Sequence, residues 1–222
     1  MGAYVKAIDP YNRLTSAHAY AEFFYPHADW ADFIITQQYG DEKTVHDWAL
    51  KHYSVPKPYV NEEYGYEGMS DKPGHGQNPD WVRRCHWSIA MAGGYATYGD
   101  WSDGVSYFYM GEPGPGKAAQ ELGYLRRFFE EVPFPEMHPD DGLTSKGFCL
   151  AKPQDYYVFY FPRGGSSEIN LTGAKGRKLT SRWFDPRSGR KRDGPRVTAG
   201  EETVVSPGPG DWVLLVRGEL SN

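Results

Sequence analysis

Three carboxylates stand close together in the stretch KPYVNEEYGYEG, residues 57–68, where a run rich in Tyr and Val ends. Glu62 and Glu63 are adjacent, and Glu67 follows four residues later among aromatic side chains. Carboxyl groups can transfer protons or attack an electrophilic carbon, so this stretch is the first candidate for a chemical site. The alternative for Glu63 is an ion pair on the protein surface.

Side-chain alternation along a strand separates the two adjacent glutamates. Asn61 and Glu63 point to one side of an extended chain, whereas Val60 and Glu62 point to the other. Val60 suits a layer of helices and Asn61 suits a polar mouth. We therefore expect Glu63 to face a cavity, and Glu62 to face outward or to pair with a base such as Lys57.

Polar and aromatic side chains follow four predicted strands, at the point where each strand ends. The strands are predicted at residues 14–18, 32–40, 57–63 and 95–101, and they end in His18, in Gln37-Gln38-Tyr39, in Asn61-Glu62-Glu63 and in Tyr98-Gly99-Asp100-Trp101. In a parallel β/α sheet or barrel, the carboxyl ends of the strands meet at the face where active sites lie. Any one of these ends could be a capped turn, but four in succession indicate a functional site.

Helical patterns separate these strands. The spacing of apolar residues predicts a helix over 41–53, and a second from the Asn78-Pro79 start to the Gly93-Gly94 stop. A third helix is predicted over 117–132. Strands that alternate with helices favour a parallel α/β arrangement.

The pattern changes after the Pro-rich stretch VPFPEMHPDDG. From Lys146 onward the chain consists of short alternating runs split by Gly and Pro at hairpin-like spacing, which predicts a small antiparallel β domain. We therefore expect two domains, at residues 1–138 and 146–222. Trp183, Phe184 and Trp212 are candidate binding platforms in the second domain, although alternation places Trp212 in the core.

Composition narrows the possible partners. A net charge of -5 argues against nucleic acid, and no run of 18 apolar residues is present to span a membrane. Aromatic residues make up 16% of the chain, which suits a carbohydrate ligand. We expect no cofactor and no metal. Cys85 and Cys149 are expected to be buried free thiols, and the opening residues lack the pattern of a secretory signal.

The order of these motifs resembles the later half of the apiosidase-like glycoside hydrolases, a (β/α)₈-barrel family. The motifs that carry the resemblance are DFIITQQYG, KPYVNEEYGYEG and RRCHWSIAMAGGYATYG. The tail, with YFPRGG, RWFDPRSG and PGPGDWVLLV, resembles the small β domain that follows such barrels and is described as collagen-binding. The resemblance implies a partial TIM barrel, about strands five to eight, followed by an antiparallel β-sandwich.

The resemblance also implies an activity and a set of site residues. It implies a retaining glycoside hydrolase that acts on plant or bacterial polysaccharides or oligosaccharides, with two carboxyl groups on opposite sides of the scissile bond. Glu63, in the sequence Glu-Tyr-Gly, would be the nucleophile at the end of the seventh strand. Arg83 or Arg84 would orient a carboxylate. The substrate-binding residues would be His18, Gln37, Gln38, Tyr39, Asn61, Tyr66, Glu67 and Trp101.

One part of the family pattern has no counterpart in these residues. The acid/base carboxylate of such barrels follows the fourth strand, and the resemblance begins just before the fifth. The expected partners are therefore a carbohydrate substrate and the missing N-terminal barrel half, and the 222 residues alone are expected to be a poor enzyme. Full-length relatives are expected to be secreted or periplasmic. Two alternatives stay open: a non-catalytic carbohydrate- or matrix-binding module, and an inactive gene fragment.

Overall fold

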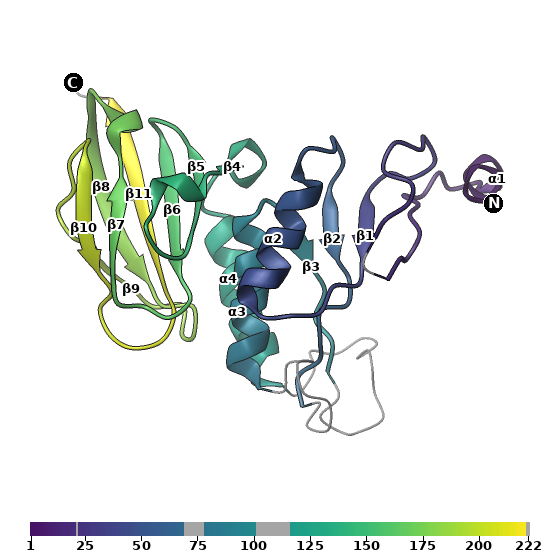
Figure 1. Cartoon of the computed structure of the whole chain (residues 1–222), viewed down its shortest axis with the longest axis horizontal. Helices are drawn as coiled ribbons and strands as arrows, with labels where there is room; N and C mark the ends of the chain where they lie inside the picture. Colours follow the sequence, from purple (N-terminus) through teal and green to yellow (C-terminus); the bar gives the residue numbers. More distant parts are fainter. Residues whose placement is uncertain (21, 69–77, 101–115, 221–222) are drawn as a thin grey trace. The chain divides into compact units, whose positions relative to one another are not determined.

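The computed structural model describes residues 1–20, 22–68, 78–100 and 116–220 (Figure 1). The chain divides into two compact units, one of residues 1–90 and 94–116 and the other of residues 91–93 and 117–222. The first unit holds a parallel sheet with helices, and the second holds antiparallel sheets. Among the described helices, none is long and apolar enough to cross a membrane.

The parallel sheet of the first unit is short. Its strands are β1 (Ile34–Thr36), β2 (Tyr59–Asn61) and β3 (Tyr95–Ala96), in that order across the sheet. The last residues of the three strands lie opposite one another, because Thr36 pairs with Asn61 and Asn61 pairs with Ala96. The chain segments that follow β1 and β2 therefore begin side by side at one edge of the sheet.

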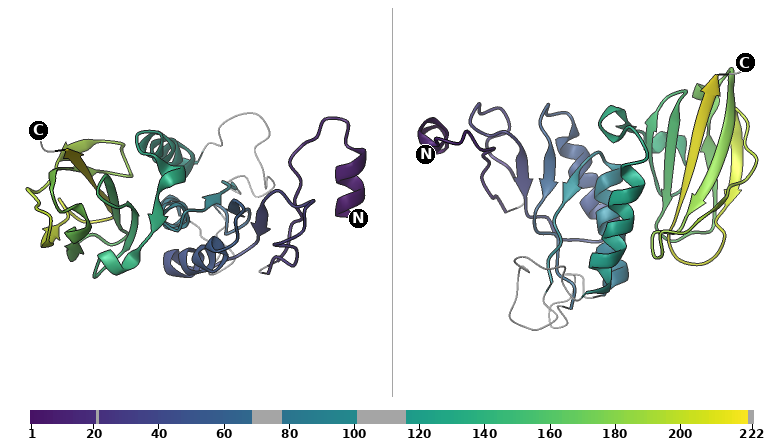
Figure 2. Two further views of the ribbon diagram at one scale, coloured as in Figure 1. Left: turned by 90° about the horizontal axis from the view of Figure 1, so that it is seen from above. Right: turned by 180° about the vertical axis from the view of Figure 1, so that it is seen from behind.

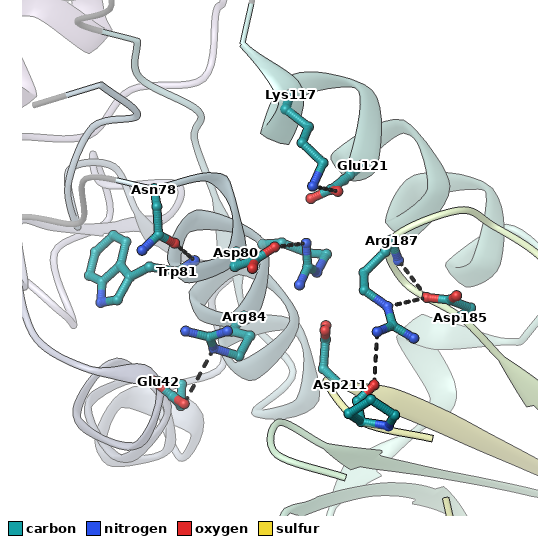
Figure 3. A network of polar contacts seen from close by, with 12 residues as sticks. Glu42, Asn78, Asp80, Trp81, Arg84, Lys117, Glu121, Asp185, Arg187 and Asp211 are labelled. Carbon is teal, nitrogen blue, oxygen red and sulfur yellow. Dashed lines mark hydrogen bonds and ion pairs between the residues drawn. The ribbon is translucent and has the colours of Figure 1, made fainter. Parts of the chain in front are cut away.

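The described residues of this part of the chain form the helices α1 (Gly2–Ile8), α2 (Glu42–Tyr53) and α3 (Pro79–Met91). The Asn78 side chain caps α3 by accepting a hydrogen bond from the Trp81 backbone N–H at 2.8 Å (Figure 3), as its place before a proline predicts. Helix α2 packs on β2, where the His52 ring stacks on Tyr59 at 5.2 Å. Helix α1 lies beyond β1, on the side away from β2 (Figures 1 and 2).

The strand predicted over residues 14–18 does not form. The Thr15 and Ser16 hydroxyls instead donate to the backbone carbonyls of Trp30 and Phe33, so side chains supply part of its hydrogen bonding. The Asp32 backbone N–H also donates to the Thr15 carbonyl at 2.8 Å, and a parallel bridge between Tyr20 and Gln37 follows this segment. The segment is therefore an irregular chain held by both backbone and side-chain hydrogen bonds.

The second unit is built on antiparallel strands. A six-stranded sheet has the order β4-β5-β6-β11-β8-β9, and β10 pairs with β7 in a separate two-stranded sheet. The helix α4 (Lys117–Phe129) and short 3₁₀ turns at Phe134–Glu136, Asp141–Leu143 and Thr172–Ala174 belong to the same unit. The strands are β4 (His138–Pro139), β5 (Phe148–Lys152), β6 (Tyr156–Phe161), β7 (Ser166–Asn170), β8 (Arg177–Phe184), β9 (Lys191–Asp193), β10 (Glu201–Val205) and β11 (Trp212–Leu220).

Both antiparallel sheets contribute to one hydrophobic core. Phe159 and Leu214 reach it from the large sheet, and Ile169 and Val204 reach it from β7 and β10. Burial of these side chains supplies most of the driving force for folding of this unit. Cys149 also lies in this core as a buried free thiol, and burial raises its pKa.

The expected aromatic platforms are not surface features. Trp183, Phe184 and Trp212 are 4%, 3% and 2% exposed, so none of them presents a ring to a ligand. Alternation predicted this correctly for Trp212, which meets Trp183 edge to face at 6.3 Å. The prediction was wrong for Trp183 and Phe184, because Trp183 packs in the core against Trp212 and the Phe184 ring packs against Phe128 with ring centres 5.0 Å apart.

The two glycine-rich motifs of the tail contact each other through one arginine. The Arg187 side chain donates to Asp185 Oδ1 at 2.7 Å (Figure 3) and to the Pro209 carbonyl oxygen at 2.8 Å. Its guanidinium lies 5.1 Å from the centre of the Trp212 ring. Gly189 closes the turn with φ +67°, a conformation that favours glycine. Arg187 thus connects the RWFDPRSG segment to the PGPGDW segment.

Candidate functional site

A buried amide fixes the end of the parallel sheet. Asn61, the last residue of β2, has no exposed surface, and its side-chain N–H donates to the Gln38 carbonyl oxygen at 3.0 Å. Its side-chain oxygen accepts from the Gln38 backbone N–H at 3.3 Å. Asn61 therefore joins the segment after β2 to the segment after β1. Gln38 and Asn61, both predicted to bind substrate, thus connect the backbone at the carboxyl end of the sheet.

The predicted nucleophile Glu63 lies next to side chains that follow the other predicted strands. The Tyr39 hydroxyl donates to Glu63 Oε1, and His18 Nε2 lies 4.0 Å from Glu63 Oε2. Burial and the neighbouring Glu63 raise the pKa of Tyr39, so this phenol stays a neutral hydrogen-bond donor. The Glu63 side chain is 24% exposed, which leaves part of it accessible.

The partner of Glu62 differs from the one expected. Glu62 Oε2 lies 2.9 Å from His18 Nδ1, whereas Lys57 donates to the Ala28 carbonyl oxygen at 2.7 Å. Alternation failed here because the strand ends at Asn61, and side chains alternate strictly only while the backbone remains in the sheet. Both adjacent glutamates consequently reach the same histidine.

Gln37 connects the histidine to the tyrosine. Its side-chain oxygen lies 3.1 Å from His18 Nε2, and its side-chain nitrogen donates to the Tyr39 hydroxyl at 2.9 Å. The hydrogen bond to Gln37 is the largest cause that raises the pKa of His18, and Glu62 and Glu63 act in the same direction against the effect of burial. The Tyr20–Gln37 bridge brings the irregular segment with His18 to this edge.

Two further predicted residues belong to a separate, buried cluster. Glu67 accepts a hydrogen bond from the Tyr98 hydroxyl at 2.9 Å, and its backbone N–H donates to the Gly99 carbonyl at 3.0 Å. The Tyr66 ring is 4% exposed, and it lies where any side chain at Gly99 would clash. Tyr66 and Glu67 thereby hold this loop together. Trp101 lies outside the described residues.

The two arginines of α3 take part in ion pairs with acidic residues of other helical positions. Arg83 pairs with Asp80 at 2.8 Å, and Arg84 lies 3.5 Å from Glu42 of α2 (Figure 3). The Arg84–Glu42 contact links α3 to α2, whereas the Arg83–Asp80 pair lies within α3. Among the described residues, no group of three or more His, Cys, Asp or Glu side chains could hold a metal ion.

The arrangement suits chemistry at a single carboxylate. Glu63 is ionisable, partly accessible, and held by the neutral hydroxyl of Tyr39 beside the imidazole of His18. Such a carboxylate can act as a nucleophile or a base, and its position follows from the donors around it. The Glu62–His18 contact was not expected from the sequence, because side-chain alternation placed Glu62 on the opposite side from Glu63, and the strand in fact ends at Asn61.

A comparison with protein families finds a match in the second part of the chain. Residues 140–217 match a family described as "Putative collagen-binding domain of a collagenase". No curated protein matches the chain.

Solved structures extend the likeness to the whole chain. A protein named "Glycoside hydrolase" has a TM-score of 0.82 at 20% identity, and the match covers 100% of this chain and 61% of that one. A family 5 glycoside hydrolase from Bacteroides vulgatus has a TM-score of 0.80 at 19% identity, with 97% and 57% covered. A "putative glycoside hydrolase" from the same organism has a TM-score of 0.77 at 18% identity, with 98% and 47% covered. At such identities the likeness shows the fold alone. The chain spans about half the length of these glycoside hydrolase structures.

Proposed function

We propose that the chain is the C-terminal part of a retaining glycoside hydrolase that cleaves plant or bacterial polysaccharides or oligosaccharides, with Glu63 as the nucleophile. The observation that carries the proposal is the position of Glu63 just after the carboxyl end of a parallel strand, where the Tyr39 hydroxyl donates a hydrogen bond to it. The similar solved structures are named glycoside hydrolases, and this supports the proposal.

In this mechanism, Glu63 attacks the anomeric carbon and forms a covalent glycosyl-enzyme that water then hydrolyses. Glu63 suits this role better than Glu62 because its hydrogen-bond partner is a neutral phenol, which leaves the negative charge of the carboxylate in place. Glu62 instead contacts the imidazole of His18. His18, Gln37, Gln38, Tyr39 and Asn61 then line or support the sugar subsite.

The acid/base carboxylate of a retaining enzyme lies about 5 to 5.5 Å from the nucleophile. We propose that a second part of a (β/α)₈ barrel, outside these 222 residues, supplies it. The first unit exposes many large hydrophobic side chains near its beginning, as expected of a surface that another part of a protein covers. These are Met1, Tyr4, Val5, Ile8, Tyr11, Leu14, Tyr20, Phe24 and Tyr25.

The test uses a protein in which an N-terminal barrel half precedes these residues, with an activated aryl glycoside as substrate. We expect Glu63→Gln to abolish turnover and Glu62→Gln to reduce it much less. Asp47→Asn is the matched control, because Asp47 is an exposed carboxylate in an ion pair with Lys43 on α2. A 2-deoxy-2-fluoro glycoside should label Glu63, and mass spectrometry of the labelled peptide identifies the residue.

The 222-residue chain without the barrel half should turn over glycosides negligibly, because acid catalysis of leaving-group departure contributes about 10² to 10⁴-fold. An extended protein that tolerates Glu63→Gln, or that becomes labelled elsewhere, would refute the assignment. Inversion of the anomeric configuration in the product would refute the retaining mechanism.

A second function is favoured by the family match of residues 140–217. We propose that residues 146–222 form a β-sandwich domain, separate from a barrel domain within 1–138, and that this domain acts as a carbohydrate- or matrix-binding module. The buried rings of Trp183 and Trp212 argue for recognition through polar rather than aromatic groups. Retention on collagen or on an insoluble polysaccharide, measured without any glycoside turnover, separates this function from the catalytic one.

A further inference from the structure

A continuous chain of hydrogen bonds joins the two adjacent glutamates through three other side chains. Glu62 contacts His18 Nδ1 at 2.9 Å, and His18 Nε2 contacts the Gln37 side-chain oxygen at 3.1 Å. The Gln37 side-chain nitrogen contacts the Tyr39 hydroxyl at 2.9 Å, and that hydroxyl contacts Glu63. Each group in this chain has its neighbours on both sides, so the direction of one bond constrains the direction of the next.

The directions follow from the chemistry of the donors and acceptors. An ionised Glu63 only accepts, so the Tyr39 hydroxyl must donate to it, and the Tyr39 oxygen is then left to accept from an N–H group. Gln37 meets that need with its nitrogen and therefore turns its oxygen toward His18. An amide oxygen only accepts, and so does the carboxylate of Glu62 on the other side of the ring. Both ring nitrogens of His18 must therefore donate.

The backbone holds these groups at fixed positions. The Glu62 backbone N–H donates to the Thr36 carbonyl at 2.9 Å, and Thr97 donates to the Glu62 carbonyl. The Gln37 backbone N–H donates to the Ala19 carbonyl at 2.9 Å, next to the histidine. Within the described part of the chain, the charged groups that face the His18 ring are Glu62 and Glu63, from the segment after β2, and the segment after β1 contributes neutral groups.

We propose that His18 is a doubly protonated imidazolium that, together with Glu62, acts as a positioning element: it sets the direction of the Gln37 amide and so directs the Tyr39 hydroxyl onto Glu63. The catalytic meaning of this positioning rests on the proposed function. The protonation state of His18 and its effect on Tyr39 do not.

Loss of one proton from His18 has a defined consequence for Glu63. The ring, with its side chain 45% exposed, gives its Nε2 proton to water, because the negative charge of Glu62 retains the proton on Nδ1, and Nε2 becomes an acceptor that faces the Gln37 oxygen. Rotation of the Gln37 amide relieves the conflict at Nε2 but turns its oxygen toward Tyr39. The hydroxyl then has a competing acceptor, and its donation to Glu63 is lost. Deprotonation of His18 thus reorients the donor of the proposed nucleophile.

The first experiment is an NMR titration of the 222-residue chain with ¹⁵N-labelled histidine. We expect both ring nitrogens of His18 to be protonated at neutral pH, and Glu62→Gln to move the titration midpoint to lower pH because it removes a facing negative charge. Asp47→Asn, which removes an exposed carboxylate on α2, should leave the midpoint unchanged. A single protonated nitrogen at neutral pH, or the same midpoint in Glu62→Gln, would overturn the proposal.

The second experiment follows the Cζ resonance of Tyr39, labelled with ¹³C and assigned by its loss in Tyr39→Phe. We expect an inflection at the pH where His18 titrates. His18→Gln should remove the inflection, because an amide N–H donates at every pH. Gln37→Leu should remove it as well, although His18 still titrates. An inflection that persists in Gln37→Leu would show a through-space charge effect and would refute the positioning role.

These measurements need no turnover, so they fail or succeed separately from the proposed function. In the extended enzyme, Glu62→Gln should shift the pH profile of kcat/KM in the same direction as the His18 midpoint, with loss of the alkaline side first. If the His18 midpoint moves and the pH profile of kcat/KM does not, His18 has no part in positioning the nucleophile for catalysis. The proposed hydrogen-bond directions would then still stand.

Discussion

Acid should destabilise the first unit through one buried histidine of α3. His86 is buried, and its Nδ1 atom is hydrogen-bonded to the Tyr64 hydroxyl. Tyr64 itself has no exposed surface and stacks on Trp81 with ring centres 5.5 Å apart. Burial lowers the pKa of His86 to about 4, because an imidazolium in this place would lose its hydration, and backbone hydrogen bonds to Ala96 and Val82 only partly offset this.

The sign and size of the effect follow from linkage. The unfolded chain titrates this histidine near 6.5 and the folded chain near 4, so below pH 6.5 the unfolded state binds more protons. The stabilising contribution of neutral His86 is present above pH 6.5 and is lost as the pH falls toward 4. A difference of about 2.5 pKa units at 1.36 kcal/mol per unit gives about 3 kcal/mol lost between pH 7 and pH 4. His18 acts in the opposite sense, because its pKa is raised.

The assay compares the free energy of opening of α3 at pH 7 and pH 4, from urea-dependent hydrogen exchange of its amides. The wild-type protein should lose about 3 kcal/mol more over this interval than His86→Gln, whose amide can still accept from Tyr64 and does not titrate. His27→Gln, at an exposed histidine, should behave like the wild type. Other titrating groups are shared by these proteins and cancel. Equal losses in wild type and His86→Gln would refute the reasoning.

Two further predictions concern the second unit. Gly147→Ala should lower its stability by more than about 2 kcal/mol, because φ is +76° and the new Cβ would clash with the Tyr160 carbonyl. The control Gly165→Ala, at φ +88° with open space around it, should cost only the backbone strain of about 1 to 2 kcal/mol. Equal losses of stability in urea denaturation of the two variants would refute this prediction. Residues 117–222 expressed alone should unfold cooperatively. A shorter protein that starts at residue 140 should be less stable, because it lacks Glu131, which forms ion pairs with side chains of β8 and β9. Equal stability of the two proteins in urea denaturation would contradict this.

Helices were predictable because their signals are local. The Asn78 cap with Pro79 predicted the start of α3, and acidic residues in the first turn indicated α2. The tail likewise gave antiparallel strands, because turn residues and period-two alternation recur over short distances. In each case the information lies within a few residues of the element that it specifies.

The site was only partly predictable because its contacts are distant in sequence. The meeting of Gln37, Tyr39 and Glu63 followed from the alignment of strand ends, which is a rule of parallel sheets. His18 reaches the same place from a segment in which the predicted strand does not form. The sharing of one histidine by two adjacent glutamates did not follow from this rule, because it depends on where β2 ends. The burial of Tyr64 with His86 also carried no signal, since a helical position does not tell which side chain of another segment it meets.

The two neighbouring glutamates differ in their partners more than in their direction. Glu62 faces the imidazole of His18, and Glu63 faces the phenol of Tyr39. His18 forms the closer contact with Glu62, at 2.9 Å, and lies 4.0 Å from Glu63. A carboxylate in a close ion pair has its oxygens engaged by the cation, whereas a neutral hydroxyl orients the carboxylate with a single hydrogen bond. The proposal of Glu63 rather than Glu62 as the nucleophile is in line with the hydrogen-bond chain, in which Glu62 contacts the histidine and Glu63 accepts from Tyr39.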